Sequence, residues 1–297
     1  MSTSDQQRTR STKASSQTLR LWAFGSFIML SINVLAQQID SDHLPMLKDW
    51  PVFNSDYIRS QNIHQIELTY SYKDNLQPIV FISRKELFHF EASGKLAKWE
   101  IWADSNKIRD KEVWTYYFED DNRLKAQHYR YRGKLEVERY SYNDSGLIEE
   151  IRHLKSSSCI ENFKYEYYHS RQYRQFALND EDRTYRSTVV NLDENGRIKS
   201  ETSRLVRGYD KTELLYWYDD EGRLIEKQEH IRGHVRSDER YVAVYENDTL
   251  QSHDYYENGD LVWHMEFLYK NGLLEHILRR YANTGRIEIM ELTYKFY

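Results

Sequence analysis

The sequence is poor in the residues that interrupt or cross-link a polypeptide: its 297 residues include one cysteine, three prolines and 11 glycines. The lone Cys159 excludes an internal disulfide, and we interpret it as a buried or neutral strand cysteine rather than a reactive thiol. The prolines, at positions 45, 51 and 78, all precede residue 80. Every later residue therefore keeps a backbone N–H that can pair in a sheet.

Motifs that would indicate a particular chemistry are also absent. The sequence contains no HExxH, GxxxxGK, GxGxxG, GxSxG or CxxC. These patterns are typical of zinc proteases, P-loop and dinucleotide sites, serine hydrolases and thiol sites. We therefore expect no cofactor, no metal ion and no catalytic residue.

Aromatic residues are abundant instead: 25 Tyr, 11 Phe and 7 Trp accompany a mean hydropathy of -0.86. Large side chains of this kind bury area while tolerating water at one end. Disordered chains are poor in them, so we expect a folded chain.

The N-terminus has the pattern of a signal peptide over residues 1–36. A polar stretch with Arg8, Arg10, Lys13 and Arg20 precedes the apolar run LWAFGSFIMLSINVLA, which ends in small or aliphatic residues. The alternative, an uncleaved anchor, would need about 20 apolar residues. Cleavage would lower the basic count from 42 to 38 and the acidic count from 47 to 46, a net charge of about -8. So acidic a chain is a poor candidate for binding nucleic acid.

Residues 37–60 form a non-repetitive lead-in, and from about residue 61 to residue 297 the chain becomes periodic. The glycines mark the period, because each of those after the N-terminal segment lies in a turn signal. One set follows an acid or amide, as in DDEGRL, and the other follows arginine, as in IRGHV. These predicted turn glycines are Gly94, Gly133, Gly146, Gly196, Gly208, Gly222, Gly233, Gly259, Gly272 and Gly285.

The glycine spacing predicts a hairpin repeat of about 25 residues, with the two kinds of turn at alternate ends. Half a repeat leaves about nine residues per strand. Short connections make consecutive strands antiparallel. Runs such as Tyr-Trp-Tyr favour strands, and no 3.6-residue stripe supports helices. We therefore expect an all-β fold: an extended, twisted antiparallel meander of about 16 strands.

Several of these turn units resemble the YD repeats of RHS-type bacterial proteins, with MORN-like bacterial repeats a looser match. The resemblance covers most of residues 61–297 and implies an extended twisted β-sheet in an exported bacterial protein. The repeat here is longer and less numerous than in that family, and the pattern runs to Tyr297 with no toxin-like domain. Toxin delivery is therefore not implied. The matching units are YDDEGRL (Tyr218–Leu224), YNDSGLI (Tyr142–Ile148), LDENGRI (Leu192–Ile198), YANTGRI (Tyr281–Ile287) and FEASGKL (Phe90–Leu96).

The strand faces bear on whether the sheet lies in a membrane. In Leu261–Lys270 one face is apolar and the other is mixed. A transmembrane barrel would need an uncharged outward face on every strand. Leu224–His230 carries charges on both faces, so we do not expect the processed chain to span a membrane.

Three weaker signals in the sequence bear on a possible site. His253, His264 and His276 recur about one strand apart, but we interpret them as solvent-facing or cross-strand histidines, since zinc needs three or four convergent ligands. The acids Asp219–Glu221 are explained by turn capping. Exposed strand aromatics could grip a sugar ring or a peptide. The candidate ligand-binding residues are Tyr216, Trp217, Tyr218 and Trp263.

These observations predict an exported, non-enzymatic β-repeat protein of a bacterial envelope, located in the periplasm, on the cell surface or outside the cell. Its partner would be an envelope or extracellular protein. The alternative function is carbohydrate binding through strand aromatics. A glycan hydrolase, which would need two convergent carboxylates in a pocket, is a weaker third.

Overall fold

The computed structural model describes residues 53–103, 111–121, 123–156, 158–208, 211–246 and 249–297, all of them within one unit. In these residues one short helix precedes 18 strands. Their bounds are α1 Ser55–Ser60, β1 Ile63–Lys73, β2 Val80–Phe90, β3 Leu96–Trp102, β4 Lys111–Phe118, β5 Leu124–Tyr131, β6 Lys134–Tyr142, β7 Ile148–Lys155, β8 Ser158–His169, β9 Gln172–Leu178, β10 Thr184–Leu192, β11 Ile198–Leu205, β12 Lys211–Tyr218, β13 Leu224–Ile231, β14 His234–Glu246, β15 Thr249–Glu257, β16 Asp260–Lys270, β17 Leu273–Tyr281 and β18 Ile287–Phe296.

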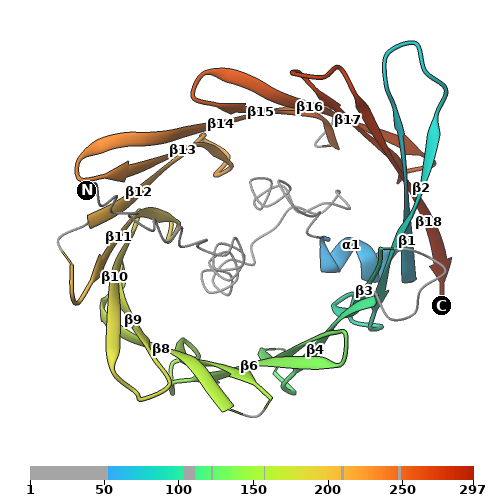
Figure 1. Cartoon of the computed structure of the whole chain (residues 1–297). Helices are drawn as coiled ribbons and strands as arrows, with labels where there is room; N and C mark the ends of the chain where they lie inside the picture. The colour runs from blue at the N-terminus through green and yellow to red at the C-terminus, as the bar shows by residue number, and fades with distance from the viewer. Residues whose placement is uncertain (1–52, 104–110, 122, 157, 209–210, 247–248) are drawn as a thin grey trace, which may run out of the picture. The chain divides into compact units, whose positions relative to one another are not determined.

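Consecutive strands pair antiparallel throughout, and the last strand, β18, pairs with the first. The β1–β18 ladder runs from Ile63 opposite Phe296 to Lys73 opposite Ile287. The sheet therefore closes into an 18-stranded barrel (Figure 1). The predicted all-β class and antiparallel meander are confirmed. The predicted count of about 16 strands and the open, extended sheet are wrong, because an open sheet would leave two unpaired edges that closure satisfies.

The turns have the geometry that the glycine pattern predicts. At Asp219–Arg223 the Gly222 N–H donates to the Asp219 carbonyl oxygen at 3.0 Å, and the Asp219 carboxylate accepts from the Arg223 N–H at 2.8 Å. Gly222 has φ +93°, a conformation that an L side chain rarely adopts. Nine of the ten predicted turn glycines have positive φ; Gly208 does not. The acids Asp219–Glu221 therefore shape a turn, as predicted.

The two ends of the barrel are called here the first and second rims. The first rim carries the turns that follow even-numbered strands, which include Gly94, Gly146, Gly196 and Gly222. The second rim carries the turns that follow odd-numbered strands, which include Gly133, Gly233, Gly259 and Gly285. Acid-led and arginine-led turns thus occupy opposite rims as far as Gly233, whereas Gly259 and Gly285 are amide-led turns of the second rim.

Helix α1 lies inside the barrel next to β1 (Figure 1) and was not predicted from the lead-in sequence. Asn54 caps it by accepting from the backbone N–H groups of Asp56 and Tyr57. Ile58 is fully buried, and the Tyr57 hydroxyl donates to the Gly272 carbonyl oxygen at the first rim, at 2.6 Å. A helix this short gains its stability from such packing rather than from its own hydrogen bonds.

Side chains alternate between an inner and an outer wall of the barrel. Phe53, just before α1, contacts the rings of Phe88 and Phe90 at 5.0 and 5.3 Å, so these residues belong to the inner wall. The cross-strand partners of Phe88 lie on the same wall as Phe88, and the remaining strand residues are assigned to a wall from their own partners in the same way. The main core cluster joins α1 to the inner wall near the closure. Its buried members are Ile58, Ile63, Ile66, Leu68, Tyr70, Phe88, Phe90, Tyr241, Leu250, Tyr255, Trp263, Met265, Phe267, Leu274, Ile277, Met290 and Leu292.

Two predictions concern segments at or beyond the N-terminal limit of the described residues. The signal peptide at residues 1–36 and most of the lead-in at 37–60 lie outside them. Within the described ranges, no helix combines the length and the apolar character that crossing a membrane requires.

Replacing Gly94 with alanine should destabilise the barrel more than the same change at Gly196. Both glycines have φ above +80°, so each substitution should cost about 1–2 kcal/mol in left-handed backbone strain. A Cβ at residue 196 meets nothing within 4 Å, whereas one at residue 94 collides with the Ser55 carbonyl oxygen of α1. That clash should cost about 1–3 kcal/mol more. Urea unfolding of both variants measures the difference, and equal losses would contradict the docking of α1 against this turn.

Candidate functional site

The inner wall carries a row of aromatic rings on four adjacent strands, called here the aromatic row: Phe88 on β2, Trp99 on β3, Trp114 on β4 and Tyr129 on β5. Each residue lies directly opposite the next in the sheet register. Successive ring centroids are 5.8, 6.1 and 4.3 Å apart, and the first two pairs are nearly parallel. The row is therefore a continuous apolar strip that runs across the strands.

The aromatic row ends on a charged pair. Tyr129 lies opposite Glu136 on β6, and Glu136 lies opposite Lys155 on β7. The Lys155 ammonium donates to the Glu136 carboxylate at 2.7 Å. An apolar strip that terminates in a cation and an anion has the composition typical of small-molecule sites, where a few polar groups orient a ligand.

Carboxylates of the inner wall hold the rings in place. The Glu86 side chain is fully buried and accepts hydrogen bonds from Tyr70 at 2.8 Å and from the Trp99 indole N–H at 2.8 Å. Arg84 completes the group with an ion pair at 2.6 Å. Burial raises the pKa of Glu86, while Arg84 and the two donors oppose that rise. At the other end of the row, Tyr129 donates to Glu112 at 3.0 Å.

The same arrangement, a tyrosine hydroxyl donating to a glutamate, recurs around the inner wall. Burial raises the pKa of Glu138 and of Glu201, against the hydrogen bonds from Tyr140 and Tyr216. A buried carboxyl group needs such donors, because an unpaired charge would be costly. The further pairs are Tyr140–Glu138, Tyr216–Glu201, Tyr241–Glu239 and Tyr281–Glu288.

The four residues predicted as a ligand site do not lie together. Tyr216 and Tyr218 are on the inner wall, where their hydroxyls donate to Glu201 and to the Ile198 carbonyl oxygen. Trp217 is on the outer wall and 39% exposed. Trp263 is on the inner wall but only 4% exposed, packed between Tyr255 and His253. Proximity in the sequence and aromatic composition do not identify the aromatic row, because its four residues become neighbours only through the strand register.

The three histidines that recur about one strand apart, His253, His264 and His276, are also separated. Asn258 and Gly259 form a two-residue turn, but a register shift between Tyr255 and Tyr256 places His264 opposite Asp254, to which it hydrogen-bonds. His253 faces inward opposite Met265, and His276 faces outward opposite Leu268. Among the described residues, no group of three or more potential ligands is placed to hold a metal ion.

Of the two predicted placements, solvent-facing or cross-strand, His253 has the cross-strand one. It is 1% exposed and packed between Tyr241 and Trp263, at centroid distances of 6.0 and 5.3 Å. Neither ring nitrogen has a hydrogen-bond partner in the described part of the chain. Burial lowers the pKa of His253 to about 4, and the Arg279 cation adds to that effect.

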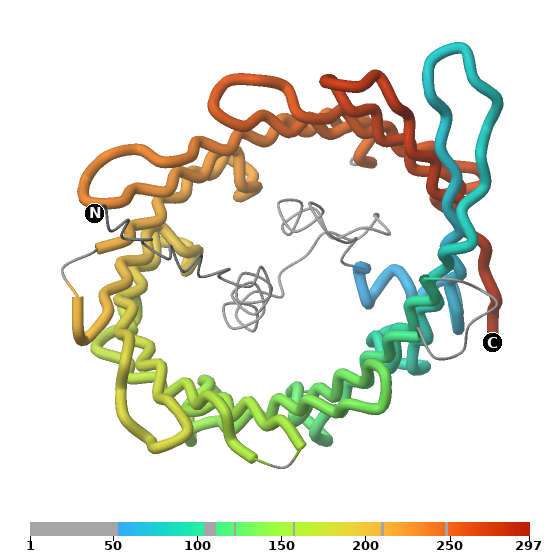
Figure 2. Tube along the Cα trace, in the orientation of Figure 1, coloured from blue at the N-terminus to red at the C-terminus, as the bar shows by residue number. Residues whose placement is uncertain are grey.

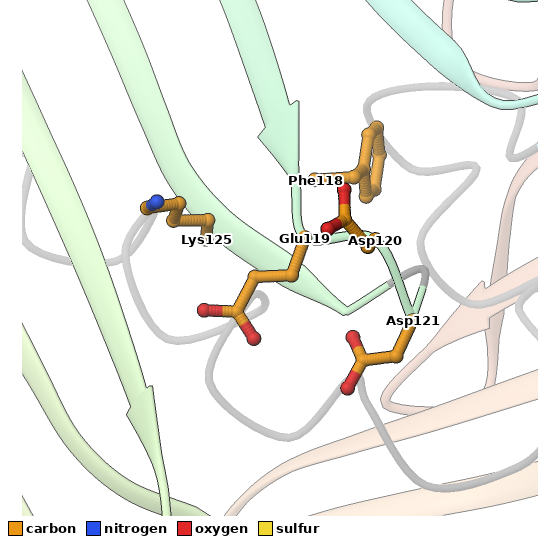
Figure 3. A pocket seen from close by; sticks show the side chains of 5 residues that line it. All are labelled: Phe118, Glu119, Asp120, Asp121 and Lys125. Carbon is orange, nitrogen blue, oxygen red and sulfur yellow. The ribbon is translucent and has the colours of Figure 1, made fainter.

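A concavity of about 410 Å³ lies at the turn between β4 and β5 (Figure 3). The carboxylates of Glu119 and Asp121 point to one side of it, and both pair with Arg123. Asp121 also accepts from the Arg123 backbone N–H at 3.1 Å. These are the contacts of an acid-led turn, so the concavity does not indicate a binding site. Its lining residues are Phe118, Glu119, Asp120, Asp121 and Lys125.

Acid should destabilise the barrel through His253, and His253→Leu should remove that effect. The folded-state pKa of about 4 lies below the unfolded value of 6.5, so the unfolded chain binds more protons between those two pH values. The contribution of neutral His253 to the free energy of unfolding is therefore fully present above pH 6.5, and it falls by about 3 kcal/mol as the pH drops to 4.

The raised pKa values of Glu86, Glu138 and Glu201 stabilise the folded state as the pH falls, which opposes the effect of His253. The informative quantity is therefore the difference in the free energy of unfolding between wild type and the His253→Leu variant at each pH. Urea unfolding at pH 4, 5, 6 and 7 measures it. His276→Leu on the outer wall is the matched control and should keep the wild-type pH dependence. A His253→Leu profile parallel to wild type would contradict the assignment.

No protein-family model matches the sequence, and a comparison with curated proteins finds no match either. Among solved structures, the barrel is similar to a porin-like protein from Bacteroides uniformis (9% identity, 79% of this chain and 97% of that one, TM-score 0.42). It is also similar to a DUF1329 family protein from Desulfovibrio piger (12% identity, 88% and 94%, TM-score 0.29). A third similar structure is a LolA superfamily protein from Nitrosomonas europaea (10% identity, 83% and 94%, TM-score 0.18). At these identities and TM-scores the likenesses establish neither a family nor a function, and the resemblance to YD repeats stays a prediction.

Proposed function

We propose that the chain is an exported, non-enzymatic binding protein of a bacterial envelope, and that it holds an elongated glycan against the inner wall of its barrel. The observation that carries the proposal is the aromatic row, Phe88–Trp99–Trp114–Tyr129, which continues into Glu136 and Lys155. Phe88 is only 2% exposed, so the rings open to a ligand are Trp99, Trp114 and Tyr129, which extend over about 10 Å at the usual strand spacing of about 4.8 Å. That length suits a chain of sugars better than a single one.

The chemistry of the aromatic row matches the two sides of a sugar. A pyranose ring has apolar C–H faces, which pack on aromatic rings, and hydroxyl groups at its edge, which need hydrogen-bond partners. Trp114 and Tyr129 are half-buried, so part of each ring faces the interior. Glu112, Glu136 and Lys155 supply acceptors and a donor beside them.

The outer wall supports function in an aqueous compartment rather than within a bilayer. Glu100, two residues before the end of β3, lies on this wall, where it pairs with Lys98 and, at 2.7 Å, with Lys111. Glu226 and Arg240 are likewise opposite one another on β13 and β14. Each lysine or arginine facing lipid at mid-bilayer would cost about 2–4 kcal/mol. Export itself rests on the N-terminal sequence pattern, and the acidic balance argues against nucleic acid as a ligand.

Trp114→Ala should weaken glycan binding at least tenfold, because it removes the central ring of the aromatic row, a loss of about 1.4 kcal/mol or more. The measurement is a glycan array with residues 37–297, followed by calorimetric titration of the best ligand. Trp217→Ala is the matched control: it removes an outer-wall tryptophan and should leave affinity unchanged. Circular dichroism checks that both variants are folded.

Three results would contradict this proposal. One is a protein that binds no glycan but captures a defined envelope protein, which would favour the scaffold function. Another is an equal loss of affinity in the Trp114 and Trp217 variants, which would remove the aromatic row from the site. The third is a change in the mass of the bound glycan, which would indicate a hydrolase.

A further inference from the structure

The hairpin that joins β1 to β2 is an exposed apolar projection at the second rim. In Figures 1 and 2 its tip extends away from the ring of strands. Leu76 is 101% exposed and Phe81 is 82% exposed. Ile79, Val80 and Ile82 are exposed as well, so apolar side chains point to both faces of the hairpin. A contiguous apolar surface of this kind on a folded protein indicates an interaction site.

The same segment has a free strand edge. Val80, Phe81 and Ile82 of β2 pair with Tyr72, Ser71 and Tyr70 of β1. On the other side of β2, the pairing with β3 begins only at Lys85, which lies opposite Trp102. In the described part of the chain, the edge of β2 from Val80 to Arg84 therefore has no strand partner, while the rest of β2 is paired on both sides. A free, apolar edge is a template for the addition of another strand.

The hairpin is held in a fixed position, which makes it a preformed surface. Arg286, in the neighbouring turn of the second rim, donates to both carboxylate oxygens of Asp74, at 2.7 and 3.0 Å. The Arg286 guanidinium also lies 4.4 Å from the centroid of the Tyr72 ring. Farther down the strand, Arg84 is held by Glu86 on the inner wall, so its charge is directed away from the free edge. An edge that is already ordered loses little entropy on binding.

The unpaired backbone groups of the free edge indicate whether a lipid or another strand binds there. In hydrocarbon, every unpaired backbone N–H or C=O along Val80–Arg84 would cost several kcal/mol, which offsets the gain from inserting the apolar side chains. A partner strand satisfies those backbone groups and covers the same side chains. The geometry therefore favours an extended polypeptide over a membrane.

We propose that this polypeptide is the same segment of a second copy of the chain, paired antiparallel across a two-fold axis at Phe81. That register places Val80 opposite Ile82 of the second copy, and Ile79 opposite Ser83. It places Arg84 opposite Pro78, so no like charges face one another. The segment is thus apolar and self-complementary, as a two-fold interface requires. A paired segment of seven residues, Pro78–Arg84, buries less than the roughly 1,200 Å² of a stable complex, so the dimer should form at micromolar concentrations.

Sedimentation velocity of residues 37–297 over a range of concentrations tests the association. Wild type should shift from monomer to dimer as concentration rises, and Phe81→Glu should raise the dissociation constant at least tenfold. Val242→Glu is the matched control, since Val242 is 47% exposed on the outer wall of β14, and it should dimerise like wild type. A wild type that stays monomeric at several hundred micromolar, or a Phe81→Glu variant that still dimerises, would overturn the proposal.

Cysteine cross-linking tests the register, in a Cys159→Ser background that removes the native thiol. Phe81→Cys should form a disulfide-linked dimer on oxidation. Val80→Cys alone should not, but a mixture of Val80→Cys and Ile82→Cys should form one, because those positions face each other across the axis. Val242→Cys should stay monomeric. Efficient linkage of Val80→Cys to itself would overturn the two-fold axis at Phe81. Binding of the monomer to lipid vesicles, without any cross-linked dimer, would overturn the addition of a strand.

Discussion

The pairing of β18 with β1 is the constraint on which the rest of this structure depends. The ladder from Ile63 opposite Phe296 to Lys73 opposite Ile287 joins the two ends of a meander that is otherwise built from local hairpins. Hairpins need little loop closure, whereas this contact spans nearly the whole described chain and carries a large entropic cost. The core cluster near the closure, with Leu68, Met290 and Leu292, provides the apolar burial that offsets it.

Closure also explains why the inner wall is rich in tyrosine and glutamate rather than only in aliphatic residues. A barrel of this strand number has too wide an interior for side chains alone to fill it. Its inner wall must therefore combine burial with polar groups, each supplied with a partner. Tyrosine meets both needs, since its ring packs on neighbouring strands and its hydroxyl donates to a carboxylate such as Glu138 or Glu201. His253, with no hydrogen-bond partner among the described residues, departs from this rule.

The sequence predicts the local part of the fold and misses the non-local part. Turns with glycine, such as Asp219–Arg223, are visible because φ above zero selects that residue. The turn at Asn179–Arg183 uses Asp182 at φ +55° in place of a glycine, so the glycine pattern does not reveal it. Closure leaves no local signal at all. The aromatic row is hidden for the same reason, since Trp99 and Trp114 become neighbours only through the register of β3 on β4.

The register matters beyond the aromatic row, because small shifts decide which wall a side chain joins. In an antiparallel sheet a one-residue slip transfers a side chain from one wall to the other. The shift between Tyr255 and Tyr256 does this within the β15–β16 hairpin, and it sets His264 against Asp254 while leaving His253 buried. The shift between Thr69 and Tyr70 in β1–β2 is different: it adds two residues, Ser83 and Arg84, to β2, so Ile82 stays on the same wall as its partner Tyr70, and it lies just where the pairing of β2 with β3 ends. Glu86, which holds Trp99 of the aromatic row, and the unpaired edge Val80–Arg84 are therefore adjacent along β2, on either side of the point where its pairing with β3 ends.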